Sequence, residues 1–202
     1  MTETTSIARS RGRPRDTEKD AAIRDAAWHI LAERGFDGLT FEALADEANC
    51  SRATLYRRYA SKVELVVDVL HETSRSIEPL LPADALPRDI LIAHATAAAF
   101  YMTGHRGKAL LHVTAAAFRV PELASATQRY GQMEKEYYLR ELRRLAPGQG
   151  DDTLAFACDT LLGSIIYHVT YMQRPLAADD IAQLVDSAIA LMTDRGLSRP
   201  IR

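Results

Sequence analysis

The chain has 202 residues, of which 47% are hydrophobic, and its formal net charge at pH 7 is −2. This apolar content is sufficient for a buried core, which excludes a chain that is disordered throughout. The slight acidity excludes a general attraction to nucleic acid, so any DNA binding must come from local patterning.

The two cysteines, Cys50 and Cys158, lie in unrelated contexts and form no CxxC motif. We find neither a secretory leader nor an apolar run of about 18 residues. These features predict a cytoplasmic protein, in which Cys50 serves as a small buried hydrophobe rather than a redox sensor.

Residues 1–15 are predicted to form a flexible basic arm. It contains four alternating arginines, Arg9, Arg11, Arg13 and Arg15. An ordinary solvated terminus explains such a segment when it stands alone. A DNA-binding domain directly after it would favour contacts with the DNA backbone or minor groove instead.

A first helix is predicted from near Thr17 to Gly35, with an apolar stripe formed by Ile23, Ala26, Ala27, Ile30 and Leu31. Trp28 lies near this stripe, which favours packing in the core or between domains over a stacking role.

A second short helix, FEALADEA, follows Thr40 as its N-cap and turns Phe41, Leu44 and Ala45 inward. The tight turn ANCS places Asn49 where a left-handed conformation is needed. Ser51 then caps a third helix in the stretch SRATLYRRY. Two short helices joined by a tight turn result.

The outward face of SRATLYRRY is unusual for protein packing. With Leu55 inward, the helical repeat turns Ala53, Thr54, Tyr56 and Arg57 outward. Tyr59 and Arg58 fall on or beside the inner side, and we favour an ion pair for Arg58 with an acid of the first or fourth helix. The outward face has the chemistry to enter a DNA groove.

A fourth helix is predicted from Ser61, which forms a capping box with Glu64, into the mid seventies, with Val63, Val66, Val67 and Leu70 on its inner face. Prolines at 79, 82 and 87 then mark a boundary. Periodicity predicts further helices at about 87–103, 107–118, 121–146, 151–173 and 178–194. We therefore expect an all-α fold, with a DNA-binding domain at 16–78 and a larger helical domain at 79–202.

The stretch TFEALADEANCSRATLYRRYASKVEL resembles the helix-turn-helix of the TetR family of bacterial transcriptional regulators. The resemblance covers about Arg11 to Leu70, although the chain has Asn49 and Cys50 where the family usually has glycine and an aliphatic residue. Asn49 still tolerates the left-handed turn conformation, and Cys50 still packs as a small hydrophobe, so both substitutions are compatible with the turn. The resemblance implies an N-terminal three-helix DNA-binding domain followed by a ligand-binding and dimerisation domain.

In a helix-turn-helix the second helix enters the major groove while the first lies across the DNA backbone. Arg57 and Arg52 are therefore the candidate base readers, and Ala53 and Thr54 allow close approach. Phosphate contacts are expected from Thr40, Tyr56, Tyr59 and Lys62. The arm residues Arg11, Arg13 and Arg15 complete the predicted DNA-binding set.

Readers of this kind dimerise on near-palindromic operators. The last two predicted helices are the candidate homodimer interface, with Leu161, Leu162, Ile165, Ile166, Val169, Ile181, Leu184, Val185, Ala188 and Met192. Gly163 permits close helix approach there, and an incidental core glycine is the alternative.

Aromatic and histidine side chains are dense in the middle helices. Core packing accounts for many of them, but their polar ends also suit an apolar cavity with a few polar anchors. The predicted ligand-binding residues are Phe100, Tyr101, His105, Phe118, Tyr137, Tyr138, Tyr167, His168 and Tyr171. No cofactor is predicted. His105 and His112, seven residues apart, suggest a metal site. Glycines interrupt that helix and no further ligand lies at suitable spacing, so no metal site is predicted.

Two other functions compete with that of a regulator. Catalytic motifs such as HExxH, GxSxG, a P-loop or a Rossmann fingerprint are absent, so an enzyme is not expected. A ligand-independent architectural DNA binder would be strongly basic throughout, and this chain is not. We therefore expect a transcriptional repressor that binds a palindromic operator as a homodimer and is released by a small apolar or aromatic effector, with the architectural protein as the alternative.

Overall fold

The computed structural model describes residues 17–76 and 79–193. In chain order these residues form α1 (Thr17–Gly38), α2 (Phe41–Glu47), α3 (Arg52–Tyr56), α4 (Lys62–Ser76), α5 (Pro87–Tyr101), α6 (His105–Ala117), α7 (Pro121–Leu145), α8 (Asp151–Ile166), the π-helical segment η1 (Tyr167–Tyr171) and α9 (Ala178–Thr193). The described part of the chain contains no strand, which confirms the all-α prediction. The helix bounds after residue 86 agree with prediction to about two residues, except that the predicted helix 151–173 becomes π-helical at Tyr167.

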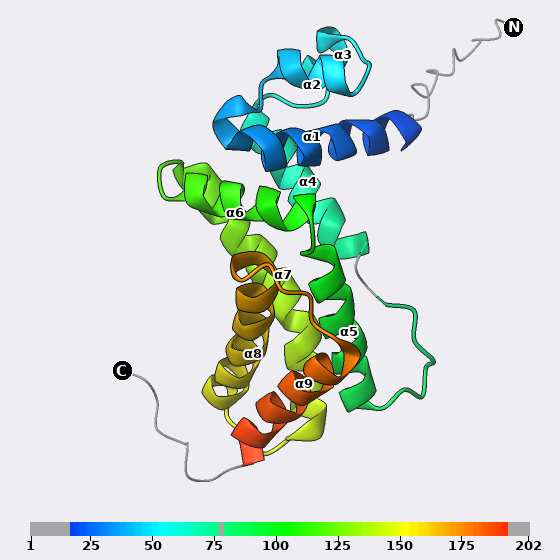
Figure 1. The fold of residues 1–202 in the computed structure, drawn as a ribbon, viewed down its shortest axis with the longest axis vertical. Coiled ribbons are helices and arrows are strands. Elements are labelled where there is room, and N and C mark those ends of the chain that lie inside the picture. The colour runs from blue at the N-terminus through cyan, green and yellow to red at the C-terminus, as the bar shows by residue number, and fades with distance from the viewer. Residues whose placement is uncertain (1–16, 77–78, 194–202) are drawn as a thin grey trace, which may run out of the picture.

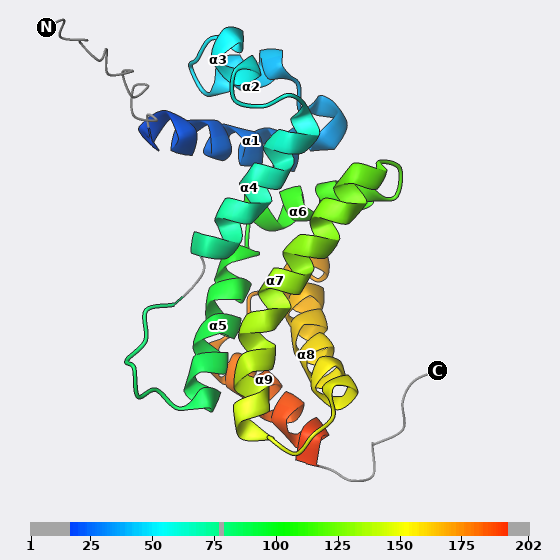
Figure 2. The same ribbon diagram turned by 180° about the vertical axis from the view of Figure 1, so that it is seen from behind.

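The helices form two packed groups (Figures 1 and 2). Helices α1, α2 and α3 lie at one end, α5, α7, α8 and α9 form a bundle at the other, and α6 lies beneath α1. The first core contains α1–α4 together with Ala109, Val113 and Ala116 of α6 and Leu123 of α7. The second core joins α5, the rest of α7, α8, η1 and α9. Helices α6 and α7 therefore complete the core of the N-terminal group, although they lie beyond the predicted boundary at residue 79.

Helix α1 was predicted to end at Gly35; it runs to Gly38, with a kink at Gly35. The backbone there has φ 68° and ψ −174°, a conformation that is essentially confined to glycine. The break lets Phe36 and Leu39, which directly follow it, enter the first core. A Cβ at Gly35 would also lie 3.3 Å from Nδ1 of His112 on α6.

Replacing Gly35 with alanine is expected to lower the free energy of unfolding by about 1–3 kcal/mol because alanine is strained at this backbone conformation. Urea unfolding followed by circular dichroism measures this. Gly131→Ala in α7 is the matched control, since its added Cβ meets no atom of the described ranges 17–76 and 79–193 within 4 Å and its helical conformation favours alanine. Equal stability of Gly35→Ala and the wild type would contradict the expectation.

Helix α4 begins with a reciprocal cap. The amide of Glu64 donates to Oγ of Ser61 at 3.2 Å, and Oε2 of Glu64 accepts from the amide of Ala60 at 2.6 Å. The predicted inner face was only partly correct: the buried residues are Leu65, Val66, Val69 and Leu70. Val63 and Val67 are half-buried because the helical repeat places them beside the stripe that α4 turns toward α1 and α7.

The segment Asp151–Tyr171 is long and apolar enough by composition to cross a membrane, unlike the expectation from sequence that no such run exists. Its inner residues, including Leu154, Cys158 and Leu161, are buried in the second core. We therefore interpret it as a core helix.

Candidate functional site

Helices α2 and α3 form the predicted helix-turn-helix. Oγ1 of Thr40 accepts from the amide of Ala43 at 3.1 Å, which caps α2. In the turn, Asn49 has φ 48°. Oγ of Ser51 then accepts from the amide of Thr54 at 3.2 Å and caps α3. These contacts confirm both predicted caps and the left-handed turn.

The outer side of α3 faces solvent as the helical repeat predicted. Leu55 is fully buried, whereas Arg52, Ala53, Tyr56 and Arg57 are exposed. Thr54 is half-buried and its hydroxyl accepts from Nη2 of Arg57 at 3.4 Å. The helix itself ends at Tyr56, three residues earlier than the predicted stretch.

Tyr56 is 61% exposed, and its ring meets Phe41 edge-to-face with centroids 4.8 Å apart. This contact ties α3 to α2, and about three fifths of the Tyr56 side chain remains accessible. Arg52 donates from Nη1 to Oε1 of Glu42 at 3.2 Å. The pKa of Glu42 lies below its ordinary value because of a backbone hydrogen bond and then the Arg52 contact. An exposed pair of this kind contributes little to stability.

Arg58 and Tyr59 anchor the end of α3 to the protein. Nε of Arg58 donates to Oδ1 of Asp20 in α1 at 2.8 Å, which confirms the predicted ion pair. The phosphate contact predicted for Tyr59 is wrong, since this residue is only 7% exposed and its hydroxyl donates to Oδ2 of Asp68 at 2.9 Å. Burial first, and then Asp68, raise the Tyr59 pKa. The helical repeat already placed Tyr59 near the inner side, and its packing there removes its hydroxyl from the DNA-facing surface.

Lys62 is also held by the protein. Its Nζ donates to the carbonyl of Phe36 at 3.0 Å and lies 4.1 Å from the centroid of the Phe36 ring. The ammonium therefore closes the carboxyl end of α1, which argues against the predicted phosphate role. The predicted arm residues Arg11, Arg13 and Arg15 lie outside the described residues.

The nine predicted ligand-binding residues are not all buried in the bundle. Phe100, Phe118 and Tyr171 are 82%, 90% and 75% exposed, and they belong to different elements. His105 and Tyr167 are exposed as well. A ligand-binding role for these five side chains stays a prediction, because composition locates aromatic residues on helices but does not tell which faces the bundle covers.

Of the other four, Tyr137 and Tyr138 lie in the bundle interior beside a histidine that the sequence did not single out. His94 of α5 is buried, its ring stacks on Tyr137 at 5.3 Å, and it lies 5.9 Å from the Tyr138 ring. Burial raises the pKa of Tyr138, and the nearby Glu134 raises it further. The sequence could have indicated that His94 is buried, because it falls on the same helical stripe as the apolar residues Leu91 and Ala95.

The two remaining predicted ligand residues have other neighbours. His168 is half-buried, and its Nδ1 lies 2.9 Å from the carbonyl of Ser164. Tyr101 meets Trp28 of α1 edge-to-face with centroids 6.3 Å apart. Trp28 is buried, which confirms that it packs between the two helical groups.

Most residues of the predicted dimer interface are buried within the chain itself, so the prediction is wrong for them. They are Leu161, Ile165, Val169, Ile181, Val185, Ala188 and Met192. The physical reason is that α8 and α9 turn their strongest apolar stripes toward each other and the bundle. Ile166 is exposed, and Leu162 and Leu184 are half-buried.

The basic run near the end of α7 is structural. Arg140 and Arg144 both bond to the buried Glu141, at 2.8 and 2.5 Å, and Arg143 bonds to Glu136 at 3.0 Å. Among the described residues, no group of three or more His, Cys, Asp or Glu side chains lies close enough to hold a metal ion. His112 lies against Gly35 instead.

Both thiols are free. Cys50 is half-buried and Cys158 is buried, in line with the expectation that Cys50 acts as a small hydrophobe. Desolvation raises the pKa of Cys50, and burial raises the pKa of Cys158 to about 12.

Comparison with known proteins agrees with this geometry. Residues 23–69 match the family model described as bacterial regulatory proteins, tetR family. The chain is 32% identical over 130 residues to the HTH-type transcriptional regulator YdeS of Bacillus subtilis (strain 168), a match that covers 64% of this chain and 60% of that protein. It is 28% identical over 187 residues to the HTH-type transcriptional repressor KstR of Mycobacterium tuberculosis (strain ATCC 25618 / H37Rv), covering 87% of this chain and 80% of the repressor.

Solved structures share the whole fold. A transcriptional regulator from Pseudomonas aeruginosa PAO1 superposes with a TM-score of 0.74 at 18% identity, covering 90% of this chain and 94% of that one. At this identity the likeness concerns the fold alone. The family match falls on the helix-turn-helix, where the exposed outer side of α3 and its caps have been described. Residues 23–69 of this chain therefore form the helix-turn-helix region that matches the tetR family of bacterial regulatory proteins.

Proposed function

We propose that this regulator is a repressor that binds a near-palindromic operator as a homodimer and releases it when a small, largely apolar or aromatic effector binds. The observation that carries the proposal is the separation of roles on and beside α3. Leu55, Arg58 and Tyr59 fix the helix to the protein, while Arg52, Ala53 and Arg57 present an exposed surface. The repressor named among the relatives supports the direction of regulation.

In this proposal Arg57 and Arg52 read base edges in the major groove, where guanidinium groups pair with guanine O6 and N7. Arg52 exchanges its exposed contact with Glu42 for DNA. Ala53 and Thr54 let the backbone approach. Thr40 and Tyr56 bind phosphate. Thr40 is exposed at the amino end of α2, and Tyr56 is exposed on the outer side of α3. The arm residues Arg11, Arg13 and Arg15 add contacts to the adjacent backbone or minor groove.

The homodimer is proposed to form through the outer face of α8 and η1. Phe156, Thr160, Gly163 and Tyr167 repeat at helical spacing and are all exposed. A glycine between large apolar side chains allows two copies of the helix to approach closely. Leu184 on α9 is half-buried and packs against the second core, and it is retained from the predicted interface. This set replaces most of the predicted interface residues.

The effector is proposed to bind within the bundle near His94, Tyr137 and Tyr138. This region combines apolar walls with imidazole and phenol groups, which suits an aromatic ligand with a few polar atoms. The proposal retains two of the nine residues predicted from sequence.

Release of DNA requires that the effector favour a conformation in which the two recognition helices are wrongly spaced. Helix α4 joins α3 to the bundle. Helix α6 is a second connection, because Arg106 near its start pairs with Asp25 at 3.8 Å and Arg119 after its end pairs with Asp37 at 3.1 Å, both on α1. A shift of α6 would therefore move α1 together with α3.

Selection from random duplex DNA with the full chain tests this function. We expect an enriched near-palindrome whose half-sites lie one helical turn apart, about 34–36 Å between centres. The reaction is run at one stated salt concentration, because phosphate contacts make affinity depend on salt. Enrichment of no sequence, or of a lone half-site with a single bound copy, would contradict a dimeric reader.

A further inference from the structure

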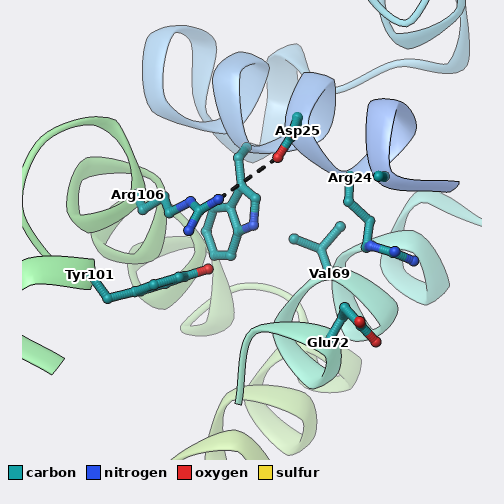
Figure 3. Close-up of a pocket in the computed structure, with 8 residues that line it drawn as sticks. Arg24, Asp25, Val69, Glu72, Tyr101 and Arg106 are labelled. Atoms are coloured by element: carbon teal, nitrogen blue, oxygen red, sulfur yellow. Dashed lines mark ion pairs between the residues drawn. The ribbon is translucent and has the colours of Figure 1, made fainter. Parts of the chain in front are cut away.

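A cavity of about 180 Å³ lies where the DNA-binding helices meet the bundle (Figure 3). It is separate from the interior region proposed for the effector. The lining residues come from four helices: Ala21, Arg24, Asp25 and Trp28 of α1, Val69 and Glu72 of α4, Tyr101 of α5 and Arg106 of α6. We call this the junction cavity. Its volume equals that of roughly six water molecules, which suits a ligand with one ring and a short chain.

The two arginines of the junction cavity are held loosely. Nη2 of Arg106 lies 3.8 Å from Oδ1 of Asp25, which is too long for a hydrogen bond. Its Nε is buried and has no hydrogen-bond partner among the described residues. Nη1 of Arg24 lies 3.9 Å from Oδ2 of Asp68. Both guanidinium groups can therefore accept a carboxylate without first losing a good hydrogen bond.

The remaining walls supply an apolar surface and two acids. Arg106 lies over the Tyr101 ring at 4.5 Å, and that ring meets Trp28 edge-to-face. The carboxylates of Asp25 and Glu72 line the same cavity as the two arginines. Paired positive and negative groups beside aromatic rings match a ligand that carries both charges, whereas a simple anion or cation would face repulsion from one pair.

We propose that the junction cavity binds a small aromatic zwitterion of the amino-acid type. Its carboxylate contacts Arg106 and Arg24, its ammonium group faces Glu72 and Asp25, and its ring packs against Trp28 and Tyr101. Because the cavity is lined by α1 and α4 on one side and by α5 and α6 on the other, its occupancy fixes the DNA-binding helices relative to the bundle. This consequence for regulation rests on the proposed repressor function, but the binding itself does not.

The test uses the full chain without DNA, so its result is independent of whether the chain reads an operator. Trp28 is the sole tryptophan, and its fluorescence reports directly on the junction cavity. L-Phenylalanine is the probe, and calorimetry supplies a second measurement. We expect saturable binding that is about tenfold or more tighter than that of 3-phenylpropionate or 2-phenylethylamine, which each lack one charge.

Arg106→Gln is expected to weaken phenylalanine binding about tenfold or more because the carboxylate loses a charged partner. The matched control is Arg119→Gln, which removes an ion pair with α1 just beyond the other end of α6 but does not line the junction cavity. It should change affinity by less than about twofold. Glu72→Gln, the second variant, should weaken phenylalanine without weakening 3-phenylpropionate. Thermal unfolding establishes that each variant is folded.

Three results would overturn the proposal. The first is no saturable signal in either measurement up to about 10 mM phenylalanine, which is weaker than millimolar affinity. The second is equal or tighter binding of either singly charged analogue. The third is an equal loss of affinity in Arg106→Gln and Arg119→Gln.

Discussion

Replacing Arg57 with alanine is expected to abolish sequence discrimination at one symmetric pair of operator positions and leave the fold intact. Arg57 is exposed, and within the described part of the chain its side chain makes a single long hydrogen bond, of 3.4 Å, to Thr54 of α3. A bidentate contact with guanine contributes about 1–3 kcal/mol of discrimination in each half-site. Selection from random duplexes with the variant beside the wild type, at equal salt, measures this change.

Arg58 provides the matched control one residue away. Its guanidinium is largely covered and bonds to Asp20 of α1 at 2.8 Å. Arg58→Ala is therefore expected to lower the free energy of unfolding by about 1–2 kcal/mol, since Asp20 loses its charged partner, but to select the same operator once folded. If Arg57→Ala retains the wild-type preference at every position, Arg57 is not a base reader.

Gly163→Arg is expected to convert the proposed homodimer to a monomer. An added Cβ at Gly163 meets none of the described residues within 4 Å, so the single chain has room for the larger side chain. Arginine also favours the helix over glycine by about 0.8–1 kcal/mol. In the proposed dimer, however, a long charged side chain at the centre of the α8 face separates Phe156 and Tyr167 from their counterparts.

Sedimentation equilibrium at micromolar protein should show half the wild-type mass, and operator affinity should fall roughly a hundredfold because one half-site binds alone. Gly131→Arg is the control: Gly131 also lies in a helix with open space around it, but on α7, away from the proposed face. It should remain a dimer. A dimeric Gly163→Arg would place the interface elsewhere.

Local interactions account for what the sequence predicted correctly. Thr40, Ser51 and Asn49 act through contacts within a few residues of themselves, so their roles in the caps and the turn follow from residue type and spacing. The outward position of Arg57 follows equally from one buried neighbour, Leu55, and the helical repeat.

The residues whose predicted roles disagree with the structure depend instead on contacts between distant parts of the chain. Tyr59 and Lys62 have the chemistry of phosphate ligands, but Asp68 and the carbonyl of Phe36 bind them from other helices. Nothing in the spacing of a single helix tells which distant partner a side chain will meet, so these contacts required the tertiary structure.

The sequence by itself determined the helices, the helix-turn-helix and its outer reading surface, because hydrophobic periodicity, caps and turns are properties of short segments. Only the tertiary structure decided which faces of α8 and α9 are buried in the chain's own core and which remain exposed for a partner. It also decided that His94 lies beside Tyr137, and that Arg106 reaches α1 from a helix about 80 residues further along the chain. A helix with apolar residues on several sides can pack in more than one way, and the choice depends on all its neighbours at once.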